Sequence, residues 1–158
     1  MRALLQRVSQ ASVSVEGKTI GKIGPGLVIL IGAESEDTEE DVRYLTDKII
    51  ELRIFSDPDG KFNLSIQDIS GEILVVSQFT LLANTRKGRR PSFTSAASPE
   101  LAESLIEKFI ESVRANGLKV ETGQFQQHML VEILNDGPVT ILLDSNDRHS
   151  PRKHSASK

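Results

Sequence analysis

The chain has 158 residues, no cysteine and a formal net charge of −3. A chain of this length forms one domain with its own buried core. The lack of cysteine excludes disulfides, thiolate nucleophiles and cysteine-bound zinc, and the negative charge excludes a global basic field that would gather nucleic acid. The N-terminal segment lacks the apolar core of a signal peptide, and no run approaches about 18 apolar residues, so we expect a cytoplasmic protein without a membrane partner.

The first half of the chain combines β-strand patterns with one helix. Residues 2–23 predict a β-hairpin with its turn at Glu16-Gly17-Lys18, because apolar and polar residues alternate on either side. The apolar run 27–31 predicts a strand that is buried on both faces. Thr38, followed three residues later by Asp41, predicts the capped start of a helix.

The second half contains the longest β-like run, residues 73–82. Ser98, with Pro99 in the first helical position, begins a second predicted helix, and Gly117 ends it. Residues 145–158 are polar and basic, and we assign this tail no structure. The remaining apolar runs predict three further strands, at residues 118–125, 129–134 and 139–143.

Together these elements predict an α+β fold, in which two helices cover a largely antiparallel sheet or open β-barrel. Two helices of this size do not cover both faces of about six strands. We therefore expect a homodimer to bury the remaining apolar surface.

A polar stretch lies between the last two predicted strands and overlaps the start of the second. Its sequence is Asn135-Asp136-Gly137-Pro138-Val139-Thr140. Proline donates no backbone hydrogen bond, so this stretch is a turn, an edge or a purpose-built feature. Asn-Asp-Gly-Pro favours a hairpin turn. The alternative is a displayed Gly-Pro dipeptide, possible in the cis form, although only about 5–6% of X–Pro bonds in folded proteins are cis.

A second polar stretch, Ser77-Gln78-Phe79-Thr80, interrupts the run 73–82. In an ideal strand Ser77 and Thr80 point to opposite faces, so only a bulge or a strand end would aim both at one substrate. A Ser or Thr nucleophile also needs an adjacent base, and His128 is the one histidine outside the tail. The alternative is that these hydroxyl groups only satisfy neighbouring backbone. No histidine pair has zinc-ligand spacing, and we expect neither a metal nor another cofactor.

The positive charge is concentrated in two places, the tail and a short loop. The loop carries four cations, Arg86, Lys87, Arg89 and Arg90. Two interpretations remain for this loop: it contacts RNA phosphates, or it is a solvent-exposed loop without a binding role. Aromatic residues are sparse, with no Trp and one Tyr, which argues against a stacking platform for single-stranded bases.

Both polar stretches, taken with a third segment, resemble the D-aminoacyl-tRNA deacylase family. The resemblance rests on residues 77–81, residues 135–140 and Lys87-Gly88-Arg89-Arg90-Pro91-Ser92-Phe93, in the family's order and spacing. It runs from Met1 to about Asp144, which implies a deacylase domain at residues 1–144 followed by the tail. It further implies a homodimer with two sites at its interface, a cis Gly137-Pro138 bond that reaches into the partner's site, and aminoacylated tRNA as substrate.

The family chemistry is chiral proofreading: hydrolysis of the ester between a D-amino acid and the 3′-terminal adenosine of tRNA. Residues 77–80 (Ser77, Gln78, Phe79 and Thr80) become the catalytic set, with the backbone N–H groups of Phe79 and Thr80 as oxyanion donors. We expect the neighbouring ribose 2′-OH to activate or orient the water, so that the RNA supplies the base that the protein lacks. We also expect Gly137 and Pro138 to form a filter that rejects an L side chain but admits glycine. Met129 either lines the pocket or packs in the core.

Two other functions remain open at this point. One is a non-enzymatic dimer that binds RNA or another nucleic acid through its basic loops. The other is a protein-only esterase that works through Thr80 and His128. Separately, Arg7 is polar within an apolar strand, and we expect it to pair with an acidic group near the dimer seam.

Overall fold

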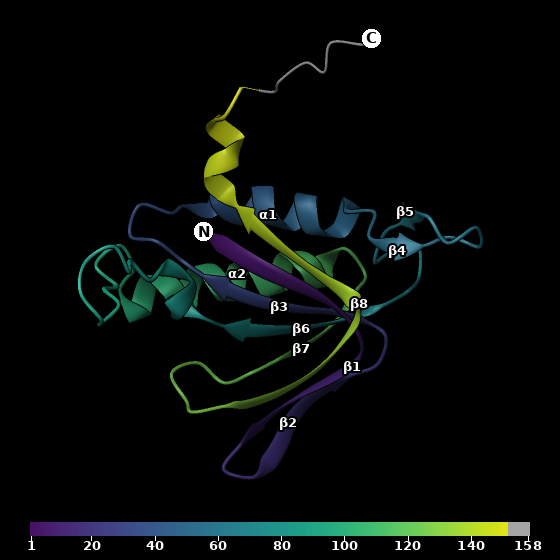
Figure 1. Ribbon diagram of the computed structural model, residues 1–158, viewed down its shortest axis with the longest axis horizontal. Coiled ribbons are helices and arrows are strands. Elements are labelled where there is room, and N and C mark those ends of the chain that lie inside the picture. The colour runs from purple at the N-terminus through teal and green to yellow at the C-terminus, as the bar shows by residue number, and fades with distance from the viewer. Residues whose placement is uncertain (152–158) are drawn as a thin grey trace.

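The computed structural model describes residues 1–151 and consists of one mixed β-sheet with two long helices (Figure 1). The predicted tail residues 152–158 lie outside the described residues. The elements are β1 (Arg2–Val15), β2 (Lys18–Ile23), β3 (Gly26–Gly32), α1 (Glu39–Glu51), β4 (Phe55–Ser56), β5 (Phe62–Leu64), β6 (Glu72–Ser77), the 3-10 helix η1 (Phe79–Leu82), α2 (Pro99–Ala115), β7 (Lys119–Thr122), β8 (Leu130–Asp144) and the 3-10 helix η2 (Ser145–His149).

Strand β1 is the centre of the sheet. It pairs antiparallel with β2, β3 and β8, while β3–β6 and β6–β7 are parallel pairs. The order is β2-β1-β3-β6-β7, and β2 also lies against β6 and β7, so the sheet nearly closes into a barrel. The predicted α+β architecture, with two helices on an open barrel, is confirmed. The small β4–β5 pair is a separate two-stranded sheet.

Two hydrophobic cores lie on opposite faces of the sheet. Helices α1 and α2 cover the first core, and the second fills the inside of the curved sheet. Side-chain alternation divides β3 between them, because Ile29 and Ile31 enter the first core while Val28 and Leu30 enter the second. Strand β3 is therefore buried on both faces, as the sequence predicts.

Both helices begin at the predicted caps. Thr38 and Asp41 form a reciprocal capping box at α1, and the Ser98 side chain accepts a hydrogen bond from the N–H of Leu101 at α2. Gly117, with φ +81, follows the end of α2. Among residues 1–151, neither helix is long and apolar enough to cross a membrane.

The run 73–82 is not one strand. Strand β6 ends at Ser77, and η1 takes the chain away from the sheet. The Gln78 N–H donates to the Ile31 carbonyl at 2.7 Å, and the Arg2 guanidinium donates to the Leu81 carbonyl at 3.0 Å. These contacts tie the turn to β3 and β1, so tertiary hydrogen bonding overrides a local β preference.

The expectation of no structure after Ser145 is also wrong for the described part of the tail. Ser145 is fully buried, and its Oγ accepts a hydrogen bond from the Met1 ammonium at 2.7 Å. The same ammonium pairs with Asp37 at 2.7 Å. Arg148 of η2 then reaches α1 and lies 3.3 Å from Asp41. The two ends of the domain are thus joined through a buried polar cluster.

We expect Asp41→Asn to destabilise the domain by about 2 kcal/mol, because it weakens the α1 cap and leaves the half-buried Arg148 without its buried partner. Asp41 is 2% exposed. Urea denaturation measures the change. Glu40→Gln is the matched control, since Glu40 also pairs with Arg148 but its side chain is 71% exposed, and its loss is expected to stay below about 0.5 kcal/mol. Equal effects of the two substitutions would contradict this account.

The same carboxylate makes stability depend on pH. Burial raises the pKa of Asp41, but hydrogen bonds from Thr38 and Ser145 and the charge of Arg148 outweigh burial, so the pKa lies below its ordinary value. The ionised carboxylate therefore stabilises the fold at neutral pH. This contribution is lost as the pH falls through the lowered pKa.

Candidate active site

A cavity of about 530 Å³ lies where β3, β6 and α2 meet. Ligand pockets usually fall in this range of volume. The ends of β3 and β6 form one wall, α2 forms the second, and the loop after β7 forms the third. Its lining includes three of the four residues predicted as catalytic, Ser77, Gln78 and Phe79, together with His128.

The turn from β6 into η1 places these groups at the rim. Ser77 ends the strand, Gln78 caps η1, and Phe79 begins it. The chain therefore departs from ideal strand alternation after Ser77, but it does not bring Ser77 and Thr80 to the same cavity. Thr80 is exposed and does not line the cavity, but its Oγ1 accepts a hydrogen bond from the Gln78 side-chain amide.

In the described part of the chain, the first two backbone N–H groups of η1 have no acceptor. The Gln78 side chain makes no cap hydrogen bond, and within residues 1–151 no acceptor pairs with the N–H of Phe79 or Thr80. Two adjacent unpaired donors are available to an anionic oxygen or a ligand carbonyl. This is the donor arrangement that an oxyanion site needs.

Within the described residues, no His, Asp or Glu side chain forms a hydrogen bond with Thr80. Its hydroxyl oxygen accepts a hydrogen bond from the Gln78 side-chain amide, and no hydrogen bond joins this hydroxyl to His128. His128 is exposed at the end of the loop after β7. In addition, no group of three or more His, Cys, Asp or Glu residues within 1–151 is arranged to hold a metal ion.

Gly137 and Pro138 form a protrusion within β8, with a cis peptide bond between them. Gln6 pairs with Thr140 and Val8 pairs with Asn135, so the four residues between them on β8 oppose only Arg7 on β1. The chain continues in the same direction on both sides. The hairpin-turn interpretation is therefore wrong, and the alternative of a displayed dipeptide is the one observed.

Arg7 of β1 contacts the protrusion and the segment before β4. Its guanidinium donates to the Asp136 carbonyl and to the Ile54 carbonyl, each at 2.9 Å, and lies 5.3 Å from the centre of the Phe62 ring. The Asp136 carboxylate is 3.9 Å from Arg7 Nε. Arg7 thus contacts an acidic residue, as expected, but its closer hydrogen bonds are to backbone carbonyls.

Within one chain the two motifs lie far apart. Arg2 contacts η1, and Arg7 contacts the protrusion. These residues are five positions apart on β1, and a strand rises about 3.3 Å per residue, so their backbones are about 17 Å apart along the strand. Figure 1 shows the loop after η1 at the left edge of the molecule and the bend of β8 to the right of its centre. The cavity of a single chain therefore does not include Gly137 or Pro138.

The other predicted site residues divide between core and surface. Met129 packs with the second core, and its sulfur accepts a hydrogen bond from the Gln124 N–H at 3.3 Å. It does not line the main cavity. The basic residues of the loop, Arg86, Lys87, Arg89 and Arg90, are all exposed, and none forms an ion pair with another described residue.

Several lining residues were not predicted from the sequence. Gly32 is one, and a Cβ there would lie 2.8 Å from the Gln78 carbonyl oxygen, so only glycine lets the turn approach β3 so closely. Phe125 also lines the cavity, as do Ala96, Ala97 and Ala102. The sequence does contain one local signal for this wall of the cavity. Ala96 and Ala97 are two adjacent small residues directly before the predicted helix start.

Comparison with known proteins assigns the chain to a family. A family model described as D-Tyr-tRNA(Tyr) deacylase matches residues 4–144. A D-aminoacyl-tRNA deacylase of Dehalococcoides mccartyi (strain CBDB1) is 61% identical over 96% of this chain and 99% of the relative. One from Thermotoga petrophila is 59% identical over 92% of this chain and 98% of the relative.

Solved structures agree on the fold. A c-Myc DNA Unwinding Element Binding Protein superposes with a TM-score of 0.86 at 42% identity, covering 91% of this chain and 98% of that one. A probable eukaryotic D-amino acid tRNA deacylase has a TM-score of 0.79 at 21% identity, covering 90% and 97%. The relatives named above as deacylases are hydrolases, which confirms the enzyme class predicted from the sequence. More particularly, the chain belongs to the D-Tyr-tRNA(Tyr) deacylase family.

Proposed function

We propose that the protein hydrolyses the ester between a D-amino acid and the 3′-terminal adenosine of tRNA, and that it also removes glycine from mischarged tRNA. One observation supports this chemistry best. Beside an apolar cavity, the backbone N–H groups of Phe79 and Thr80 have no acceptor within residues 1–151, and no hydrogen bond there joins Thr80 to a side-chain base.

Ester hydrolysis needs a water, an oxyanion stabiliser and correct positioning. Backbone donors in a shielded pocket stabilise the tetrahedral oxyanion, and one such donor is worth about 3–4 kcal/mol in other hydrolases. The terminal ribose carries a 2′-OH beside the ester, and it orients or activates the attacking water. The substrate thereby supplies the proton-transfer group that Ser77, Gln78 and Thr80 lack, at high effective concentration.

Chirality is selected by a second copy of the chain. The protrusion at Gly137 and Pro138 does not line the cavity of its own chain, so we infer that it acts on the site of a partner. In a homodimer, the carbonyls of these two residues occupy the space that an L side chain would need. Such a filter acts against side chains and admits glycine, which has none.

Deacylation of three matched substrates tests the proposal. At nanomolar enzyme, D-tyrosyl-tRNA and glycyl-tRNA are expected to lose their amino acid rapidly, while L-tyrosyl-tRNA is spared. Hydrolysis of the L ester at a comparable rate would disprove the filter. Survival of all three esters would disprove the activity.

Thr80→Ala is expected to retain most of the deacylase activity, within about threefold, because the backbone N–H of Thr80 remains and its hydroxyl has no base. Single-turnover rates on D-tyrosyl-tRNA measure the effect. A loss of about a thousandfold would instead support Thr80 as the nucleophile, and activity on D-tyrosyl esters of simple alcohols would then implicate the Thr80–His128 esterase.

A second candidate function is binding of nucleic acid without catalysis. The specific observation in its favour is the 42% identical structure named a c-Myc DNA Unwinding Element Binding Protein. The basic loop provides the charge for it. The two functions separate in one assay, because a binding protein would retain charged tRNA without releasing its amino acid.

A further inference from the structure

Two phenylalanine rings meet at the mouth of the cavity. The ring of Phe79, in η1, and the ring of Phe93, in the loop before α2, lie edge to face, with centroids 4.9 Å apart and planes at 67°. Phe79 is 58% exposed even with this contact. A fixed aromatic surface beside a ligand cavity suits contact with a flat apolar group.

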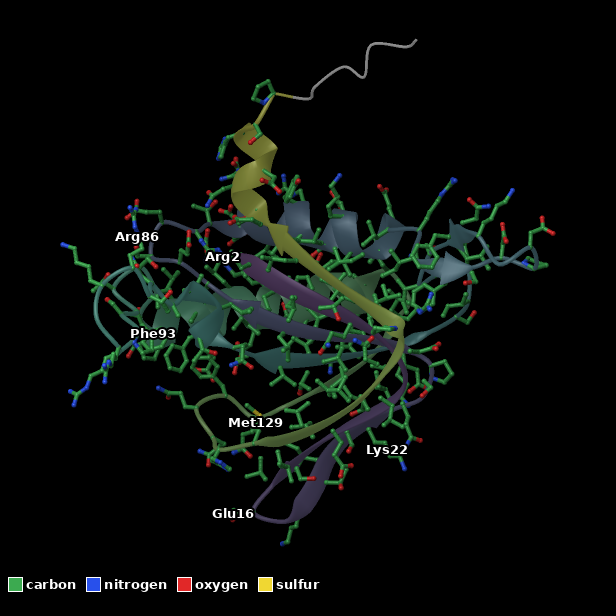
Figure 2. The ribbon with its side chains drawn as sticks, in the orientation of Figure 1. Arg2, Glu16, Lys22, Arg86, Phe93 and Met129 are labelled. Carbon is green, nitrogen blue, oxygen red and sulfur yellow. The ribbon has the colours of Figure 1, made fainter. Side chains whose placement is uncertain are left out.

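Backbone pairing holds the loop that carries Phe93. Asn84 and Ser92 exchange two backbone hydrogen bonds, at 2.8 and 2.9 Å, and the Asn84 side chain accepts another from the Arg86 N–H at 3.0 Å. The loop therefore presents its cations and its ring from one closed segment. Figure 2 shows Arg86 and Phe93 at the same end of the molecule, away from Lys22 and the hairpin tip at Glu16.

We propose that the Phe79–Phe93 pair is a stacking platform for the nucleotide that precedes the terminal adenosine, while the basic loop receives the adjoining phosphates. This proposal rests on the proposed function and adds a binding site for the RNA strand outside the cavity. With the terminal adenosine and its amino acid in the cavity, the preceding nucleotide leaves across the rim where Phe79 lies. Proteins bind single-stranded RNA through this combination of aromatic faces and cations.

Stacking requires no particular base at this position. Every base has a π-face, so a stacking contact gives affinity without reading base identity. The sparse aromatic content of the chain argues against such a platform only if the rings are scattered. Here the fold brings together two of the six phenylalanines, Phe79 and Phe93, which are 14 positions apart in the sequence.

The test compares two substrates that differ only beyond the terminal nucleoside, D-tyrosyl-tRNA and 3′-O-D-tyrosyl-adenosine. Phe93→Leu removes the ring and keeps an apolar side chain. We expect it to lower kcat/KM on the tRNA by about tenfold, with the adenosine ester changed less than twofold. Phe93→Tyr should restore the tRNA rate. Phe62→Leu, at another exposed phenylalanine, should leave the ratio of the two rates unchanged.

Equal losses on both substrates, or no loss on either, would disprove the stacking platform.

A binding measurement keeps the test independent of catalysis. Uncharged RNA with the tRNA 3′ end is compared with the same RNA made abasic at the nucleotide before the terminal adenosine. The wild-type protein is expected to bind the abasic RNA about tenfold more weakly, and equal affinity would also overturn the platform. Absence of turnover with the RNA-binding difference intact would disprove the proposed function alone.

Discussion

D-tyrosyl-tRNA that ends in 2′-deoxyadenosine is expected to bind normally and to be hydrolysed at least about 100-fold more slowly than the natural substrate. General acid–base groups contribute about 10²–10⁴-fold to enzymatic rates, and in the described part of the site no hydrogen bond joins Thr80 to a side-chain base. Removing the 2′-OH therefore removes the only such group in the proposed mechanism.

Single-turnover rates and dissociation constants measured side by side separate the two effects. The matched control is the 2′-deoxy sugar placed one nucleotide earlier, which should leave the rate within about twofold because that ribose is remote from the ester. Near-normal hydrolysis of the deoxy-terminated substrate would eliminate substrate assistance. Lost binding, rather than lost turnover, would indicate that the 2′-OH serves only recognition.

Gly137→Ala is expected to lower kcat/KM for D-tyrosyl-tRNA by about 100-fold and to reduce the preference for D over L. Gly137 has φ +139, and a Cβ there would lie 2.8 Å from Val139 Cγ2 and 3.1 Å from Arg7 Nη2. The protrusion must therefore shift, and displacements of about 1 Å in positioning elements cost rates of this size. Initial rates on the D and L esters measure both effects.

Gly17→Ala provides the control for backbone strain. Gly17 also has a positive φ, +77, but it lies at the hairpin tip, where an added Cβ would meet nothing within 4 Å. This substitution should cost about 1 kcal/mol of stability and leave the D/L ratio unchanged. If Gly137→Ala retained the D/L ratio as well, the filter would have to lie elsewhere.

Local signals explain what the sequence predicts well. The capping residues Thr38 and Ser98 mark both helix starts, and Gly117 marks a helix end, because each satisfies backbone geometry within a few residues. The uninterrupted apolar run of β3 likewise reflects burial on two faces. The paired motifs also identify the family, since their residue types, order and spacing are read directly along the chain.

Features that depend on distant contacts were not predictable in the same way. Residues 79–82 have β-like composition, yet they form a 3-10 turn that Arg2 contacts at the Leu81 carbonyl and that Ile31 anchors through the preceding Gln78 N–H. Ser145 looks like the start of a polar tail, yet it is buried because the Met1 ammonium needs an acceptor. The cavity walls combine residues from β3, α2 and the loop after β7, and no local pattern states that these segments meet.

The central position of β1 governs the order in which the domain is completed during translation. The strands that pair with β1 on one side, β2 and β3, are synthesised soon after it, whereas β8 ends only at Asp144. One long edge of β1 therefore stays open on the ribosome until nearly the whole domain has emerged. Unpaired edges of this kind are prone to aggregation, and sheets built from such distant pairings fold slowly. A chain truncated before β8 would keep this edge exposed, which favours its recognition by chaperones over accumulation as a folded fragment.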